Sequence, residues 1–99
     1  MAEAKQIARV SQNTLYRDVQ GEAVLLNLDT GEYFGLDEVG TRIWHLIVEK
    51  GDLGAVEAAM LEEFAVEAPV LATDLRRIVG ELVAKRLLEV EPAPTRSTP

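Results

Sequence analysis

The sequence contains no cysteine and a single histidine, His45. Without cysteine, the chain has no disulfide framework, no thiolate nucleophile and no thiolate metal site. One histidine without cysteine also cannot make a usual zinc site. These absences exclude a disulfide-stapled secreted scaffold, and we expect neither a bound metal nor a cofactor.

Long apolar runs and an excess of basic charge are also missing. No stretch approaches the roughly 20 apolar residues that span a membrane, and residues 1–6 lack the apolar run of a signal peptide. A cytoplasmic location is therefore the default expectation. With 17 acidic and 10 basic side chains, the formal net charge is −7. This balance argues against nucleic-acid binding, which usually depends on a basic face, and mildly favours a neutral or basic peptide as partner.

What the chain does have is enough apolar material for one core. It contains 99 residues, of which 47% are hydrophobic, and this fits one domain and leaves no room for two. Residues 92–99 are rich in Pro, Ser and Thr with little to bury. We therefore expect a domain over residues 1–91 and a disordered tail over residues 92–99.

The first part of the chain has the pattern of β-strands. Residues 7–10 and 14–19 have an extended character, and Gln20-Gly21 is a turn signal. Residues 23–28 form an apolar run of strand length, followed by the loop 29–31, in which Gly31 can supply the positive φ of a three-residue hairpin loop. The return strand, residues 32–36, completes the strongest local signal in this half.

From residue 37 onward the apolar period becomes helical. Asp37 is the expected N-cap of a first helix that stops at Gly51, and Asp52 or Gly54 opens a second. Pro69 suits the first turn of a third helix, and residues 87–90 close the domain. A small antiparallel sheet needs one face covered. The order predicts an α+β, winged-helix-like domain in which a three-stranded antiparallel sheet is followed by three helices.

No group of residues in this sequence has the pattern of a catalytic site. Catalysis needs a nucleophile, an acid–base pair or a metal. His45 falls inside the first helix, where we interpret it as a surface residue. Glu62 and Glu63 are adjacent in a helix and do not share a face. We therefore expect no catalytic residues and a protein that is not an enzyme.

The segment VLLNLDTGEYFGL (residues 24–36), followed by VGTRIW (residues 39–44), resembles the PqqD-like family. The apolar pattern of the third helix is a weaker match, and the resemblance covers about residues 20 to 90. It implies a RiPP recognition element, which binds the leader of a ribosomally made, modified peptide. Free-standing members act in lasso-peptide pathways beside a leader peptidase, or in pyrroloquinoline quinone biosynthesis beside a radical SAM enzyme. We favour the lasso-peptide branch.

The resemblance also implies where the leader binds. In the family it lies antiparallel to the second strand of the hairpin, in a cleft between that strand and the third helix. This agrees with the physical expectation that an unpaired sheet edge accepts an extended peptide. The candidate peptide-binding residues are Glu32, Tyr33, Phe34, Gly35 and Leu36 on the strand, and Leu71, Asp74, Leu75, Arg77 and Ile78 on the helix.

Each of these residues also has a purely structural interpretation. Tyr33 and Phe34 point to opposite faces of their strand. Either one packs into the core and the other lines the groove, or both are held by packing within the domain. Gly35 marks a bulge, a close approach or the end of the strand. On the third helix the three apolar candidates serve equally as core, and Asp74 and Arg77 serve equally as a solvated face or an intradomain pair.

Two other functions compete with leader binding. A winged-helix DNA-binding regulator needs Arg and Lys concentrated on a recognition helix. The third helix has basic residues such as Arg76 and Lys85, but also Asp74 and Glu81, in an acidic chain. The other alternative is a structural subunit of a larger enzyme, with the sheet edge permanently buried.

Overall fold

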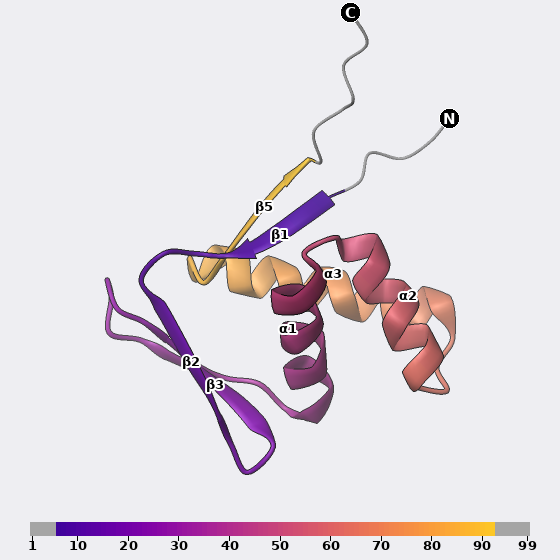
Figure 1. Ribbon diagram of the computed structural model, residues 1–99, viewed down its shortest axis with the longest axis horizontal. Helices are drawn as coiled ribbons and strands as arrows, with labels where there is room; N and C mark the ends of the chain where they lie inside the picture. Colours follow the sequence, from indigo (N-terminus) through magenta and orange to yellow (C-terminus); the bar gives the residue numbers. More distant parts are fainter. Residues whose placement is uncertain (1–5, 93–99) are drawn as a thin grey trace, which may run out of the picture.

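A computed structural model describes residues 6–92 of the chain (Figure 1). The elements in order are β1 (Gln6–Val10), β2 (Thr14–Val19), β3 (Glu22–Asn27), β4 (Tyr33–Gly35), α1 (Glu38–Lys50), α2 (Leu53–Glu63), α3 (Ala68–Ala84) and β5 (Leu88–Pro92). Strands β2, β3 and β4 form an antiparallel three-stranded sheet in that order, and β1 pairs with β5 in a separate two-stranded sheet. The predicted α+β class, with a three-stranded sheet and three helices, is confirmed.

Strand β5 goes beyond the expectation that residues 87–90 simply close the domain. Its apolar residues Leu88 and Val90 alternate with Glu89 and Glu91, which is the period of a strand with one buried face. It pairs antiparallel with β1, so the two ends of the described chain lie side by side. Pro92, expected to open the tail, is the last residue of β5. Residues 93–99 lie outside the described residues.

The two hairpins of the three-stranded sheet form at the predicted turns. Gln20 and Gly21, which join β2 to β3, have φ angles of 55° and 86°. Two successive positive φ angles are typical of a two-residue type I′ turn. Gly31 in the next loop has a φ of 77°, as expected. The side chain of Asn27 stabilises this loop from inside, because its Oδ1 accepts from the amides of Asp29 (2.8 Å) and Thr30 (3.2 Å).

The predicted helix boundaries are also confirmed. Oδ1 of Asp37 accepts a hydrogen bond from the amide of Gly40 at 2.8 Å, which caps the start of α1. Gly51 ends α1 with a φ of 76°. Asp52 caps α2 through the amide of Gly54 at 2.8 Å. Pro69 lies in the first turn of α3, where its missing N–H costs no helical hydrogen bond.

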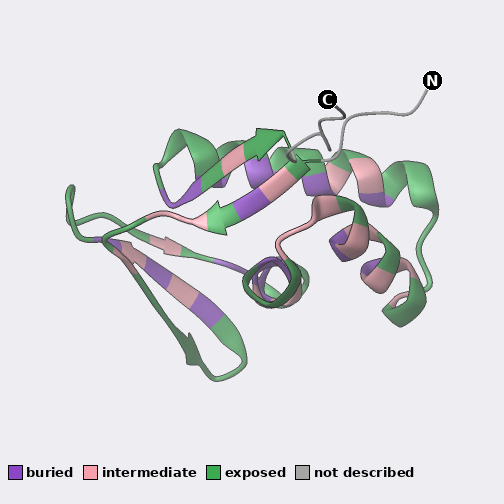
Figure 2. Cartoon of the chain, turned by 45° about the horizontal axis from the view of Figure 1, so that its top comes forward, coloured by how far each residue is buried: buried purple, intermediate pink, exposed green. Residues whose placement is uncertain are grey.

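The core lies between the three-stranded sheet and the helices. Residues of β3 alternate between buried and half-buried, which is visible as purple and pink bands in Figure 2. The buried set, including Ala23 and Leu25, faces the helices, and we call this the inner face of the sheet. Trp44 of α1 is fully buried, and its ring packs edge-on against Tyr16 of β2 at 5.3 Å between centroids. Helix α1 stands between the sheet and α2 (Figure 1).

Gly80 offers a direct test of the helix assignment. It is exposed in the middle of α3, and a Cβ built there meets nothing within 4 Å. Glycine inside a helix costs about 0.5–1 kcal/mol relative to alanine. We expect Gly80→Ala to raise the free energy of unfolding by about this amount in a urea titration. As the control, Gly31→Ala should lower it by about 1 kcal/mol because of the positive φ. A destabilised Gly80→Ala variant would show that the helix needs this glycine.

Candidate peptide-binding site

Strand β4 is one edge of the three-stranded sheet, and its hydrogen bonds to β3 fix which of its backbone groups are free. The amide of Asn27 donates to the carbonyl of Glu32, and the amide of Leu36 donates to the carbonyl of Ala23, both at 2.9 Å. Bonded and non-bonded pairs alternate along an antiparallel ladder. Phe34, which lies midway between these two bonds, therefore directs its own N–H and C=O toward β3.

Tyr33 and Gly35 consequently direct their backbone N–H and C=O away from β3, toward the open edge. Within residues 6–92, no strand pairs with this side of β4. Each of the two residues contributes one donor and one acceptor, in the alternating arrangement that an added antiparallel strand requires. The edge can therefore accept a short extended peptide through main-chain hydrogen bonds.

The other predicted strand residues do not offer free backbone groups in this way. Glu32 lies just before β4, and its amide donates to the Thr30 hydroxyl at 3.2 Å. Leu36 lies just after β4, and its carbonyl accepts from the Thr41 hydroxyl at 3.3 Å. Of the five candidates on this segment, the geometry thus selects Tyr33 and Gly35 as the residues that present the edge.

The side chains of β4 alternate as expected. Phe34 is half-buried and packs against the core on the inner face of the sheet. Tyr33 is 71% exposed and belongs to the opposite, outer face. Gly35 pairs in regular register with Val24, has no positive φ, and a Cβ built on it meets nothing within 4 Å. Gly35 is the last residue of β4, as the strand-end interpretation expects, and neither backbone strain nor a contact inside the described chain requires a glycine there.

The C-terminal end of α3 lies against the hairpin. The Nζ atom of Lys85, which caps α3, sits 5.6 Å from the centroid of the Phe34 ring. The Asn27 side chain donates from Nδ2 to the carbonyl of Lys85 at 2.9 Å. Counting back by helical turns, Glu81, Ile78 and Asp74 share the face of Lys85. This stripe runs along α3 from Lys85, the residue that lies over the Phe34 ring.

The predicted residues of α3 separate into three groups. Leu71, Leu75 and Ile78 are core residues, but they keep 4%, 6% and 8% exposure, whereas the deepest core side chains have less than 2%. Asp74 is half-buried on the stripe described above. Arg77 is exposed and forms an ion pair with Glu81 at 3.7 Å, so the intradomain interpretation holds for it.

Leu75 faces a different part of the surface from Ile78. It lines a cavity of about 880 Å³ on the α2 and β5 side of α3, together with residues such as Val79 and Val83. Ile78 does not line that cavity and lies on the Lys85 side of the helix. Ile78 and Asp74 thus lie on the side of α3 that ends at Lys85 over the Phe34 ring, whereas Leu75 borders the cavity on the other side and Leu71 stays in the core.

Two residues on the stripe of α3 that ends at Lys85 were not among the sequence candidates. Lys85 reaches the Phe34 ring, and Glu81 lies on the same stripe of α3. Helical spacing from Ile78, by three and by seven residues, was the signal that could have found them. Asn27 was also missed. Asn27 is a polar residue in an apolar strand, and only 3% of it is exposed. A polar side chain buried to this extent must have hydrogen-bond partners, and those of Asn27 hold the hairpin and α3 together.

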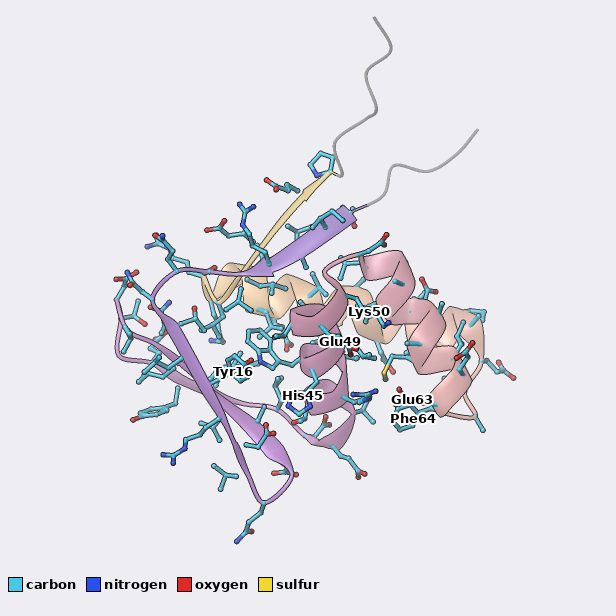
Figure 3. All side chains as sticks on the ribbon, in the orientation of Figure 1. Tyr16, His45, Glu49, Lys50, Glu63 and Phe64 are labelled. Carbon is cyan, nitrogen blue, oxygen red and sulfur yellow. The ribbon has the colours of Figure 1, made fainter. Side chains whose placement is uncertain are left out.

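His45 joins α1 to the opposite edge of the sheet. Its Nε2 lies 3.0 Å from Oδ1 of Asp18 on β2, close to Tyr16 (Figure 3). The predicted surface position thus becomes a half-buried contact between helix and sheet.

Across the described part of the chain, no group of three or more His, Asp or Glu residues could hold a metal ion. Nor is any described helix long and apolar enough to cross a membrane.

An ion pair between α1 and the end of α2 lowers the pKa of a carboxyl group. Arg42 of α1 donates from Nε and Nη2 to the carboxylate of Glu63 at 2.8 and 2.6 Å. These hydrogen bonds lower the pKa of Glu63, against a smaller opposing effect of burial. The pair therefore stabilises the fold above the usual carboxyl pKa, and this contribution is lost as the pH falls. Both groups are over one third exposed, so the contribution is small.

Comparison with known proteins identifies the family. The family model of coenzyme PQQ synthesis protein D (PqqD) matches residues 22–88. The chain belongs to the PqqD family. The match covers both the hairpin and the three helices, close to the range expected from the sequence resemblance. No curated protein matches this PqqD-like chain at a significant level.

Solved structures similar to this PqqD-like domain include two leader-peptide complexes. TbiB1 in complex with the TbiA(beta) leader peptide is 40% identical, with a TM-score of 0.78, over 82% of this chain and 94% of TbiB1. A lasso peptide synthetase B1 complexed with the leader peptide is 20% identical, with a TM-score of 0.75, over 83% of this chain and 96% of that protein. The second likeness supports the fold alone.

Proposed function

We propose that this PqqD-like domain binds the leader segment of a precursor peptide as an added antiparallel strand on β4. It has no catalytic activity of its own and delivers the peptide to a separate leader peptidase or other modifying enzyme of lasso-peptide biosynthesis. The observation that carries the proposal is the open edge of β4, where Tyr33 and Gly35 present unpaired backbone groups beside α3. The 40% identity to TbiB1, which binds a leader peptide, supports it.

The inner face of the added strand supplies specificity in this proposal. A leader residue opposite Phe34 points toward the helices, because side chains at one position across a sheet share a face. There it meets the Phe34 ring and the stripe of α3 that contains Ile78 and Asp74. An apolar or aromatic anchor fits this position, and Asp74 is placed to receive a donor from the leader.

Without catalysis, the domain would act by raising the local concentration of the precursor peptide at the modifying enzyme. Within the described residues, the single histidine is bonded to Asp18 on the β2 side of the molecule, away from the β4 edge. A delivery role requires only that the leader and the enzyme be held at the same time. A PqqD-type chaperone of pyrroloquinoline quinone biosynthesis is the alternative within this proposal, and it differs in the partner enzyme, a radical SAM enzyme in place of a leader peptidase.

Regulation through DNA has less support. Of the basic residues of α3, Arg77 is paired with Glu81, and Arg76 borders the cavity on the α2 side. The net charge of −7 opposes binding to phosphates.

The test uses the full chain and a lasso-peptide precursor, chosen from any short reading frames that neighbour its gene. Calorimetry should give the same affinity, within about threefold, for the whole precursor and for its leader segment alone, and no binding of the core segment. Mass spectrometry should show an unchanged precursor after incubation with the domain. Binding through the core segment, or a mass change with contaminating enzymes excluded, would overturn the proposal.

A further inference from the structure

The outer face of the three-stranded sheet carries an unusual set of exposed apolar side chains. Leu15 pairs with Leu26, and Leu26 pairs with Tyr33, so one apolar row crosses all three strands. The two ends of this row are 56% and 71% exposed. An exposed apolar row that ends at the open edge of a sheet is a surface that an added strand would extend.

The next row of the outer face ends in a gap. Val24 is half-buried in the middle strand, and its partner on β4 is Gly35. The space over Gly35 is open, because a Cβ there meets nothing within 4 Å, and the backbone does not adopt a positive φ. Gly35 is the last residue of β4, and a glycine paired in a sheet often marks a close approach of another chain. The described chain provides no such approach, so the glycine points to a ligand.

Strand addition brings a ligand side chain to this gap. Tyr33 and Gly35 form the hydrogen-bonded pairs with the added strand, so the leader residues opposite them point to the outer face. The leader residue between these two points to the inner face, opposite Phe34. A leader held on β4 is therefore in contact with both faces of the sheet.

We infer that the outer face of β4 is a second specificity surface for the leader, and that Gly35 is its specificity-determining residue. The leader residue paired with Gly35 is a large apolar or aromatic side chain, which lies across the glycine and contacts Val24. Aromatic side chains are known to cover glycine in a neighbouring strand in this way. The leader residue two positions on, paired with Tyr33, extends the apolar row of Leu26. This inference rests on the proposed function and adds the class of leader that the domain selects.

The experiment compares the peptides that two forms of the full chain select from a phage-displayed library of random twelve-residue peptides. Wild-type protein should enrich peptides with a large apolar residue at one outward position. Gly35→Leu fills the gap and should enrich small residues at that position. The preference at the neighbouring inward position, opposite Phe34, should stay the same. Gly80→Leu is the matched control, because its Cβ also enters open space but on α3, and it should enrich the wild-type peptides.

Synthetic peptides then measure the effect directly. Alanine at the outward position should weaken binding to the wild-type protein by about tenfold, because one buried apolar contact is lost. The same alanine peptide should bind Gly35→Leu less than about threefold more weakly than the parent peptide does. If Gly35→Leu does not fold, the alanine peptide measured on wild-type protein decides the matter. Enriched peptides with no preference at that position, or the same preference in both forms, would refute the inference and leave strand addition intact. Enrichment of no peptide at all would refute the proposed function itself.

Discussion

A proline in place of Tyr33 should abolish leader binding and leave the domain folded. The amide of Tyr33 faces the open edge, so its removal breaks no hydrogen bond inside the described sheet. It does remove a donor to the added strand and places the proline ring against it. We expect the affinity for the leader to fall by at least about tenfold, the effect of roughly 1.4 kcal/mol or more, as measured by calorimetry.

Phe34→Pro is the matched control for this substitution. The amide of Phe34 points to β3, so the same change one residue later breaks the hairpin and lowers the free energy of unfolding by about 1–3 kcal/mol. Tyr33→Pro with wild-type affinity, or Tyr33→Pro as destabilised as Phe34→Pro, would mean that the register of β4 is not the one described.

Removal of the Phe34 ring should have the second large effect on binding. The ring lies on the inner face at the open edge, where it contacts Lys85 and where the leader anchor enters. A buried aromatic anchor at an interface commonly contributes more than about 2 kcal/mol. We therefore expect Phe34→Ala to weaken leader binding by more than about tenfold, measured by fluorescence anisotropy of a labelled leader.

Tyr16→Ala separates this effect from a general loss of stability. Tyr16 is also an aromatic residue on the inner face, but it lies on β2, the other edge, where its ring packs against Trp44. Its removal should lower stability by about 1 kcal/mol and leave the affinity unchanged. If Tyr16→Ala lost the leader and Phe34→Ala kept it, the leader would bind at β2.

The hairpin could be predicted from the sequence because its determinants are local. Gly31 supplies a positive φ, Asp37 caps the next helix, and the apolar run between residues 23 and 28 has the length of a strand. Each of these signals acts within a few residues. The same holds for the stops at Gly51 and Pro69, since caps and prolines restrict only their own turn.

The pairing of β1 with β5 could not be predicted in the same way. Ala8 faces Val90 across the whole length of the chain. The alternation of Leu88, Glu89 and Val90 was present in the sequence, but a short alternating run at the end of a chain does not identify its partner strand.

The sequence could predict which segments form the candidate site, but not which residue of each segment faces the peptide. The family resemblance placed it on β4 and α3, and the structure brings these two elements together through Phe34 and Lys85. Which residues of β4 present the open edge depends on register, which is fixed by a hydrogen bond between Asn27 and Glu32. Likewise, periodicity placed Leu75 and Ile78 on one broad stripe, and only the packing of α3 shows that Leu75 lines the cavity on the other side.

The two edges of the sheet offer a direct comparison within one molecule. On β2 the amide of Leu28 bonds to the carbonyl of Asn13, so the alternation leaves the amides of Thr14, Tyr16 and Asp18 facing outward. Amide hydrogen exchange, followed by NMR on the full chain with and without the leader peptide, reports on both edges at once. Strand addition on β4 predicts slower exchange at Tyr33 and Gly35 on binding, with no change at the three outward amides of β2. Protection on β2 with unchanged exchange at Tyr33 and Gly35 would contradict it.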